Sequence, residues 1–192
     1  MEGIEDLEAL VAFGVVFSLF AFVIMVVLYI LGAIARFKYL RVRGYENSWL
    51  AFIPVINVYG LVEATYGKGE KIRIYGWDAP AIVLKIWPII NFILSFFLSP
   101  IPYIGGVIGL VLTILNIMFL VLIFRDSMER LNKQVSSGLA VLAILITLVQ
   151  NIMLLCEASK YEAGSLNYIY DNRILISQST EGGVFSFLNG SK

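Results

Sequence analysis

The sequence predicts an all-α integral membrane protein with four transmembrane helices and one short interfacial or re-entrant helix. Two observations lead to this fold class. The 192-residue chain is 59% hydrophobic and only 15% charged, whereas a typical soluble domain is about 25% charged. The chain also contains several uncharged stretches that reach the roughly 20 residues a helix needs to cross a bilayer. We expect 1–156 to form the membrane domain and 157–192 to form an extramembrane tail.

The first span is predicted at 9–34. Four acidic residues precede it, which suits the first turn of a helix, and no charge follows until Arg36. At 1.5 Å per residue this run exceeds the roughly 30 Å hydrocarbon core of a bilayer. An acidic start lacks the basic region of a secretory signal. We therefore expect this segment to be retained as a membrane helix.

Cations and aromatic residues alternate directly after this span, in the segment R-F-K-Y-L-R-V-R-G-Y at 36–45. Aromatic rings favour the headgroup level of a bilayer, and cations there face anionic lipid. A basic and aromatic patch can also bind RNA, but beside a membrane span the lipid interpretation is stronger. We expect the lipid bilayer as a partner and no nucleic acid.

The segment S-W-L-A-F-I-P-V-I-N-V-Y-G at 48–60 is apolar and uncharged, yet it contains Pro54 and Asn57. The uncharged stretch around it would measure about 24 Å as a helix, which is short for a span. Pro54 would bend that helix, and Trp49 and Tyr59 would mark the membrane interface. We expect 48–62 to be an interfacial or re-entrant helix, with a full crossing as the open alternative.

A polar loop at 67–78 follows, in which 71–75 alternates like a short strand. The second span is predicted at 79–98. Lys85 lies near its start and is expected to snorkel to the headgroups. Pro88 and Asn91 repeat the P-x-x-N spacing of the earlier segment. Because unpaired polar groups are costly in hydrocarbon, we expect both asparagines to bond to backbone freed by the prolines or to a neighbouring helix.

The third span is predicted at 103–124. Gly105 and Gly109 form a G-x-x-x-G pattern, which lets two helix backbones approach closely. The partner of these glycines could be another protein or the chain's own first helix. Past the span, acid-first pairs at i,i+4 spacing predict that the helix continues into the cytoplasm, where an apolar stripe accompanies it: Met128, Leu131 and Val135.

The fourth span is predicted at 139–156, with Gln150 and Asn151 near its far end. The tail at 157–192 changes character and contains a pattern typical of a small hairpin at 167–176. A single hairpin is marginally stable in water. We therefore expect the tail to be hairpin-like or disordered.

One resemblance adds to this architecture. The pattern W-x-A-F-I-P-x-x-N-x-Y at 49–59, followed about a helix later by W-P-x-x-N at 87–91, resembles a family of small bacterial multi-pass membrane proteins of uncharacterised function. That family also places a K-x-x-x-x-G junction before its last apolar helix, which Lys133 and Gly138 match. The resemblance covers 36–156, and the tail departs from it. It implies the architecture and a bacterial origin, but it implies no activity.

Residue chemistry argues against an enzyme. The chain has no histidine and one cysteine, Cys156, which excludes imidazole ligands and a multi-cysteine zinc site. The predicted span cores hold no acid. We expect no catalytic residue, metal or cofactor, and we interpret the protein as a non-enzymatic accessory or scaffold subunit that binds another membrane protein or itself. The alternative is a small channel or transporter with Asn57 and Asn91 near its pathway, because proline-broken helices mark substrate sites in transporters.

The distribution of cations predicts the topology. Lys and Arg collect in 36–78 and 125–137, whereas the amino-terminal flank and the 99–102 turn have none. Cytoplasmic loops collect such residues, so both basic segments should be cytoplasmic. With four crossings, both termini would lie outside the cell membrane. If 48–62 crossed instead, 125–137 would be outside and the tail inside.

Overall fold

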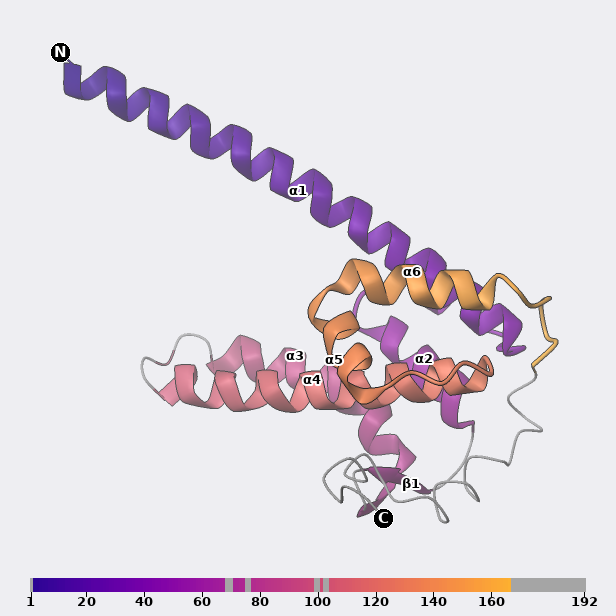
Figure 1. Cartoon of the computed structure of the whole chain (residues 1–192). Coiled ribbons are helices and arrows are strands. Elements are labelled where there is room, and N and C mark those ends of the chain that lie inside the picture. The colour runs from indigo at the N-terminus through magenta and orange to yellow at the C-terminus, as the bar shows by residue number, and fades with distance from the viewer. Residues whose placement is uncertain (1, 68–70, 75–76, 99–100, 102–103, 167–192) are drawn as a thin grey trace.

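A computed structural model (Figure 1) describes residues 2–67, 71–74, 77–98, 101 and 104–166. The elements in chain order are helix α1 (Glu2–Val42), the 3-10 helix η1 (Ser48–Phe52), helix α2 (Ile56–Tyr66), strands β1 (Lys71–Ile74) and β2 (Trp77–Pro80), and helices α3 (Ala81–Leu98), α4 (Ile104–Arg130), α5 (Ser137–Leu145) and α6 (Thr147–Ala158). The hairpin predicted at 167–176 lies outside the described residues.

The all-α architecture is confirmed, with three helices long and apolar enough to cross a membrane. These are α1, α3 and α4, and the pair α5 and α6 is a fourth candidate if its two helices count as one span. The prediction of one continuous helix at 139–156 is wrong, because α5 and α6 meet at an angle of 117°. Ile146 leaves the helical conformation at the bend, with φ −107° and ψ 83°. Ile146 and Thr147 are both β-branched, which lowers helix propensity at this point.

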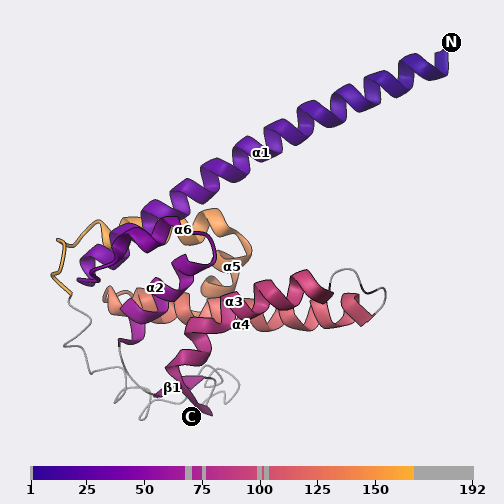
Figure 2. The ribbon, with the colours of Figure 1, turned by 180° about the vertical axis from the view of Figure 1, so that it is seen from behind.

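Helix α1 has two parts with different surroundings. Its amino-terminal part extends alone, away from every other helix (Figures 1 and 2). Its last two turns run beyond the predicted end at 34 and are buried, including Ala35, Tyr39 and Leu40. These turns stay helical past the span because η1 and α2 pack against them and shield their apolar face.

The segment predicted as one helix at 48–62 is two short helices separated by a break. The break begins at Ile53, which is extended at φ −95° and ψ 119°. A residue before proline is pushed out of the helical region by the proline ring, so Pro54 ends η1 instead of kinking a longer helix. Val55 then takes a positive φ of 68°, and α2 starts at Ile56.

The alternating pattern predicted at 71–75 is confirmed over Lys71–Ile74, which form strand β1; residue 75 lies outside the described residues. Strand β1 pairs antiparallel with β2, and the register places Lys71 opposite Pro80 and Ile74 opposite Trp77. Strand β2 occupies residues 79 and 80, the first two residues of the predicted span at 79–98. Helix α3 therefore begins two residues later than predicted, at Ala81.

The core lies where the carboxyl-terminal ends of α1 and α4 meet α2, α5 and α6 (Figure 1). The apolar stripe predicted to project into the cytoplasm belongs to this core, since Met128, Leu131 and Val135 are all buried. Helix α4 stops at Arg130, and Asn132 adopts the left-handed conformation with φ 57°. Asparagine tolerates that conformation, which commonly ends a helix. The chain then turns back, and the stripe packs inward.

Candidate functional site

Three hydroxyl groups from three helices meet in the core. The Tyr39 hydroxyl of α1 lies 2.9 Å from Thr65 Oγ1 of α2, which lies 2.9 Å from Ser127 Oγ of α4. Thr65 and Ser127 each also contact a carbonyl one turn back in their own helix, Leu61 O at 2.7 Å and Ile123 O at 2.6 Å. Three hydroxyl protons therefore serve four contacts. The three hydroxyl groups therefore share their protons, and their hydrogen bonds connect α1, α2 and α4 at one point.

A buried carboxylate lies one residue from this group. The Tyr66 hydroxyl donates a hydrogen bond of 2.7 Å to Asp126 Oδ2, and Arg125 Nη2 lies 3.4 Å from Oδ1. Asp126 is completely buried. Burial, followed by the neighbouring carboxylate, raises the pKa of Tyr66 well above its usual value. Tyr66 therefore keeps its proton and remains a donor to Asp126.

Arg43 adds a second charged residue to this cluster. Its side chain is 2% exposed, and Nε donates to the carbonyl oxygen of Ala64 at 3.0 Å. The sequence pattern had placed Arg43 among cations facing lipid, and that placement is wrong for this residue. The α1 helix ends at Val42, so Arg43 follows the turn and points into the core, whereas Arg41 stays exposed. We call the set Tyr39, Arg43, Thr65, Tyr66, Asp126 and Ser127 the buried polar cluster.

The sequence pattern did not identify this cluster. The sequence pattern placed Asp126 only in an acid-first i,i+4 pair with Arg130. Its partner Tyr66 is 60 residues away in the chain, and no local spacing reveals such a contact. The one available signal was an aspartate two residues after the apolar run of 103–124, since ionisable residues at a span end that face the bundle interior are often functional.

Lys85 is held by the protein instead of snorkelling freely. Its Nζ lies 3.9 Å from Glu63 Oε1 and 5.7 Å from the centre of the Tyr59 ring. The Tyr45 hydroxyl donates to the same Glu63 carboxylate at 3.1 Å. These contacts connect α2 to α3 and give Tyr59 a position beside a charge. Trp49, the other predicted interface aromatic, is 57% exposed.

The two P-x-x-N elements lie on different helices, and their amides are not bonded as predicted. Asn57 is buried in α2, and Asn91 lies on α3 one turn after Pro88. Within the described part of the chain, neither amide makes a side-chain hydrogen bond. Asn91 Oδ1 is buried without a partner, as is Nε1 of Trp87. The edge of the Trp87 ring packs instead on Phe119 of α4, with centroids 4.8 Å apart.

The glycines of the G-x-x-x-G pattern have unequal surroundings. A Cβ added at Gly105 would collide with the carbonyl oxygen of Leu98, so this position is required by the close turn between α3 and α4. A Cβ at Gly109 would meet no atom within 4 Å. The first helix supplies none of the neighbours at either glycine.

The close approach between helices occurs at Gly32 of α1. A Cβ there would lie 2.9 Å from Nδ2 of Asn151 on α6, and that amide lies 3.5 Å from the carbonyl oxygen of Leu28. Asn151 is 2% exposed. It had been predicted near the far end of a span, but the bend at Ile146 turns α6 along α1 and buries it.

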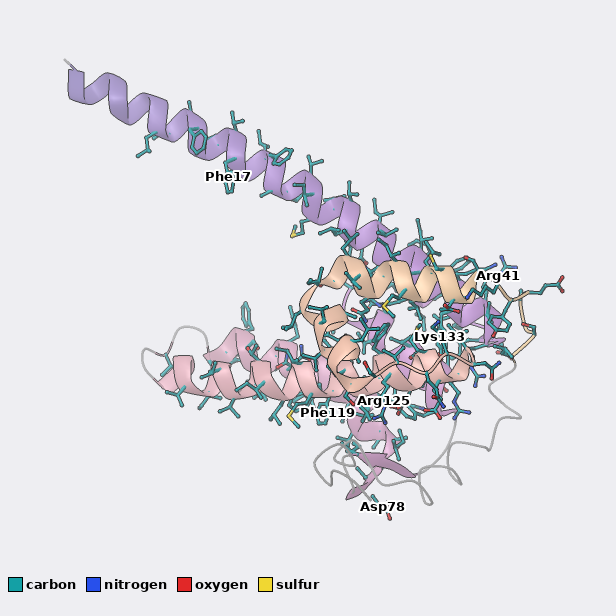
Figure 3. All side chains as sticks on the ribbon, viewed as in Figure 1. Phe17, Arg41, Asp78, Phe119, Arg125 and Lys133 are labelled. Atoms are coloured by element: carbon teal, nitrogen blue, oxygen red, sulfur yellow. The ribbon has the colours of Figure 1, made fainter. Side chains whose placement is uncertain are left out.

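The amino-terminal part of α1 carries a shallow groove bordered by its small residues. Gly14 and Ser18 lie one turn apart, and Ser18 Oγ donates to the Gly14 carbonyl at 2.8 Å. Val11, Val15 and Leu19 form the sides of the groove. A Cβ at Gly14 would meet no atom within 4 Å. Figure 3 shows side chains projecting from this part of the helix, with Phe17 far from the other labelled residues.

Among the residues that the structure describes, no three His, Cys, Asp or Glu side chains come together in a way that could hold a metal ion. Cys156 is exposed. Comparison with protein-family models, curated proteins and solved structures gives no match for this chain. The family resemblance noted at 49–59 and 87–91 stays a prediction.

Proposed function

We propose that this protein is a non-enzymatic accessory or scaffold subunit of a cell-membrane complex, and that it binds another membrane protein or a second copy of itself through the amino-terminal half of α1. One observation supports the proposal above all others. The most apolar 18-residue window of α1 has no buried residue, whereas the corresponding windows of α3 and α4 are 11% and 28% buried. The part of α1 that this window covers is exposed, so its surface is free for another helix.

The small residues of α1 indicate which face of this surface would contact the partner helix. Gly14 and Ser18 form a small-x-x-x-small pattern on one face, and the groove between their larger neighbours is open. Helices in membranes associate through such faces because the backbones can approach closely. The open side of Gly109 on α4 is a second candidate contact, whereas Gly105 is occupied by the chain's own turn.

The contacts around α5 and α6 support a topology with three crossings. The Tyr161 hydroxyl, just after α6, donates to the Leu131 carbonyl before α5 at 2.8 Å. Lys133 lies 3.8 Å from Glu157. The chain therefore enters and leaves the α5–α6 pair at the same end of α4. We infer that the pair is re-entrant, that α1, α3 and α4 cross, and that residues 159–166 share the cytoplasmic side with 125–137. The amino terminus stays outside.

A glycine substitution series tests the subunit proposal. Gly14→Leu should abolish copurification from native membranes while thermal stability in detergent stays unchanged, because a Cβ at this position has open space. Gly106→Leu is the matched control, since its surroundings are equally open but it lies on α4. A Gly14→Leu protein that retains every partner, with wild-type copurification, would refute a contact at this face.

The buried polar cluster favours the channel or transporter as the second candidate function. Ionisable residues that face the interior of a helix bundle often mark ion or proton pathways, and Asp126 is buried in this way at the cytoplasmic end of α4. Purified protein reconstituted in liposomes would be tested for ion and solute flux, with Asp126→Asn as the comparison. Flux by a lone monomer that Asp126→Asn removes would replace the subunit proposal.

A further inference from the structure

A depression of about 520 Å³ lies at the carboxyl-terminal end of α1. This volume falls within the roughly 300–1,000 Å³ of ordinary small-molecule sites. Its lining comes from the end of α1, the following turn, the start of η1 and the segment after α6, and includes Phe37, Arg41, Tyr45, Glu46, Trp49 and Gly164. Gly164 is held there by a 2.8 Å hydrogen bond from its N–H to the Arg41 carbonyl.

The depression presents two opposite charges and an aromatic ring. Arg41 and Glu46 are both exposed, and within the described ranges no ion pair joins them or links either to another residue. The Arg41 guanidinium lies 5.8 Å from the centre of the Phe37 ring, which fixes its direction. Trp49 is 57% exposed beside them. An arginine binds phosphate well, while a carboxylate and an indole ring together suit an ammonium group.

The depression lies at the level where phospholipid headgroups are found. A bilayer with its headgroup regions is about 40–45 Å thick, or about 30 helical residues. Measured from Ala9, where the uncharged run starts, that distance ends near Lys38. The segment η1 folds back along α1, with the Tyr29 hydroxyl donating to the Phe52 carbonyl at 2.6 Å and the Phe37 and Phe52 rings 5.5 Å apart. Exposed Trp49 and Phe52 thus face the lipid beside the charges.

We propose that this depression binds the headgroup of a phospholipid that carries an ammonium group. Arg41 holds the lipid phosphate, and Glu46 with Trp49 holds the ammonium. A purely anionic headgroup would place negative charge beside Glu46 and is disfavoured. The inference depends on the membrane embedding of α1 and not on the subunit role, so a failure of one leaves the other standing.

Lipid retention by the purified full-length protein tests this site. After delipidation in detergent, the protein is mixed with equal amounts of phosphatidylethanolamine and phosphatidylglycerol, and the retained lipids are counted by native mass spectrometry. The wild type should retain phosphatidylethanolamine preferentially. Glu46→Gln should reduce this preference about tenfold, since it removes the charged partner of the ammonium. Arg41→Gln should lower retention of both lipids.

Glu162→Gln serves as the matched control, because Glu162 is also exposed at this end of the molecule but does not line the depression. It should behave as the wild type. Equal or greater retention of phosphatidylglycerol by the wild type would overturn the proposal, as would an unchanged preference in Glu46→Gln. Competition by soluble glycerophosphoethanolamine at equal concentration would also overturn it, because a lipid site must gain affinity from the acyl chains.

Discussion

Removing one hydroxyl from the buried polar cluster should destabilise the protein measurably. Tyr66→Phe deletes the donor of the 2.7 Å bond to Asp126 and leaves the ring in place. A hydrogen bond to a charged group contributes about 1.5–3 kcal/mol. The contact of the same carboxylate with Arg125, at 3.4 Å, is longer than the bond from Tyr66.

For a chain of this size each kcal/mol lowers the midpoint of thermal unfolding by about 2–4 °C, so Tyr66→Phe should lower it by about 3–12 °C. The assay is thermal unfolding in detergent followed by circular dichroism. Tyr161→Phe is the matched control, because its hydroxyl donates to the neutral Leu131 carbonyl and is only partly buried. It should cost about 0.5–1.5 kcal/mol.

A double-mutant cycle with Asp126→Asn separates the pair from the other contacts of each residue. The Tyr66→Phe change should cost less in the Asp126→Asn background than in the wild type, because the charge it served is gone. A midpoint for Tyr66→Phe within about 1 °C of the wild type, below the 2–4 °C expected for one kcal/mol, would refute the claim that this hydrogen bond holds α2 to α4. Equal costs in both backgrounds would refute the coupling.

Three further predictions follow from the geometry. Single cysteines would be placed at 5, 133 and 162 in a Cys156→Ser background and treated in intact cells with an impermeant thiol reagent. Only the cysteine at 5 should be labelled, and labelling at 162 would support four crossings instead of three. Gly32→Leu should destabilise the monomer by about 2 kcal/mol or more, because overpacking at its contact with Asn151 forces α1 and α6 apart, while Gly14→Leu leaves the unfolding midpoint unchanged in the same assay. Asn151→Leu should lower that midpoint. Asn91→Leu should leave it unchanged or raise it, because the substitution removes a buried oxygen that has no partner. A larger drop in the midpoint for Asn91→Leu than for Asn151→Leu would show that the Asn91 amide is bonded in the membrane.

The features that could be predicted from sequence are those set by local chemistry. Charge content and long apolar runs predict the membrane helices, and the alternation at 71–75 predicts β1. Pro54 marks the place where the helix predicted at 48–62 breaks, although it ends the helix instead of bending it. In each case the deciding interaction lies within a few residues of the chain.

The features that could not be predicted depend on distant partners. Asp126 is buried beside Tyr66, which is 60 residues away in the chain, and its spacing to Arg130 indicated only a pair on the surface of one helix. The bend at Ile146 contains neither proline nor glycine, and it becomes favourable because α6 can then pack along Gly32 of α1. Sequence periodicity carries no information about such a choice between equally apolar faces.

Two hydrogen bonds at the carboxyl-terminal end of α1 can form only late in the synthesis of the chain. The last carbonyls of a helix have no partner within the helix, and two of them, at Arg41 and Val42, accept from the N–H groups of Gly164 and Leu166 at 2.8 and 3.1 Å. These two donors lie more than 120 residues further along the chain, so both hydrogen bonds form only after Gly164 and Leu166 have been made. Synthesis proceeds at about 5–20 residues per second, so these two hydrogen bonds form many seconds after α1 has been made. The carboxyl-terminal end of α1 therefore acquires these two contacts late, after the helices from α2 to α6 have been synthesised.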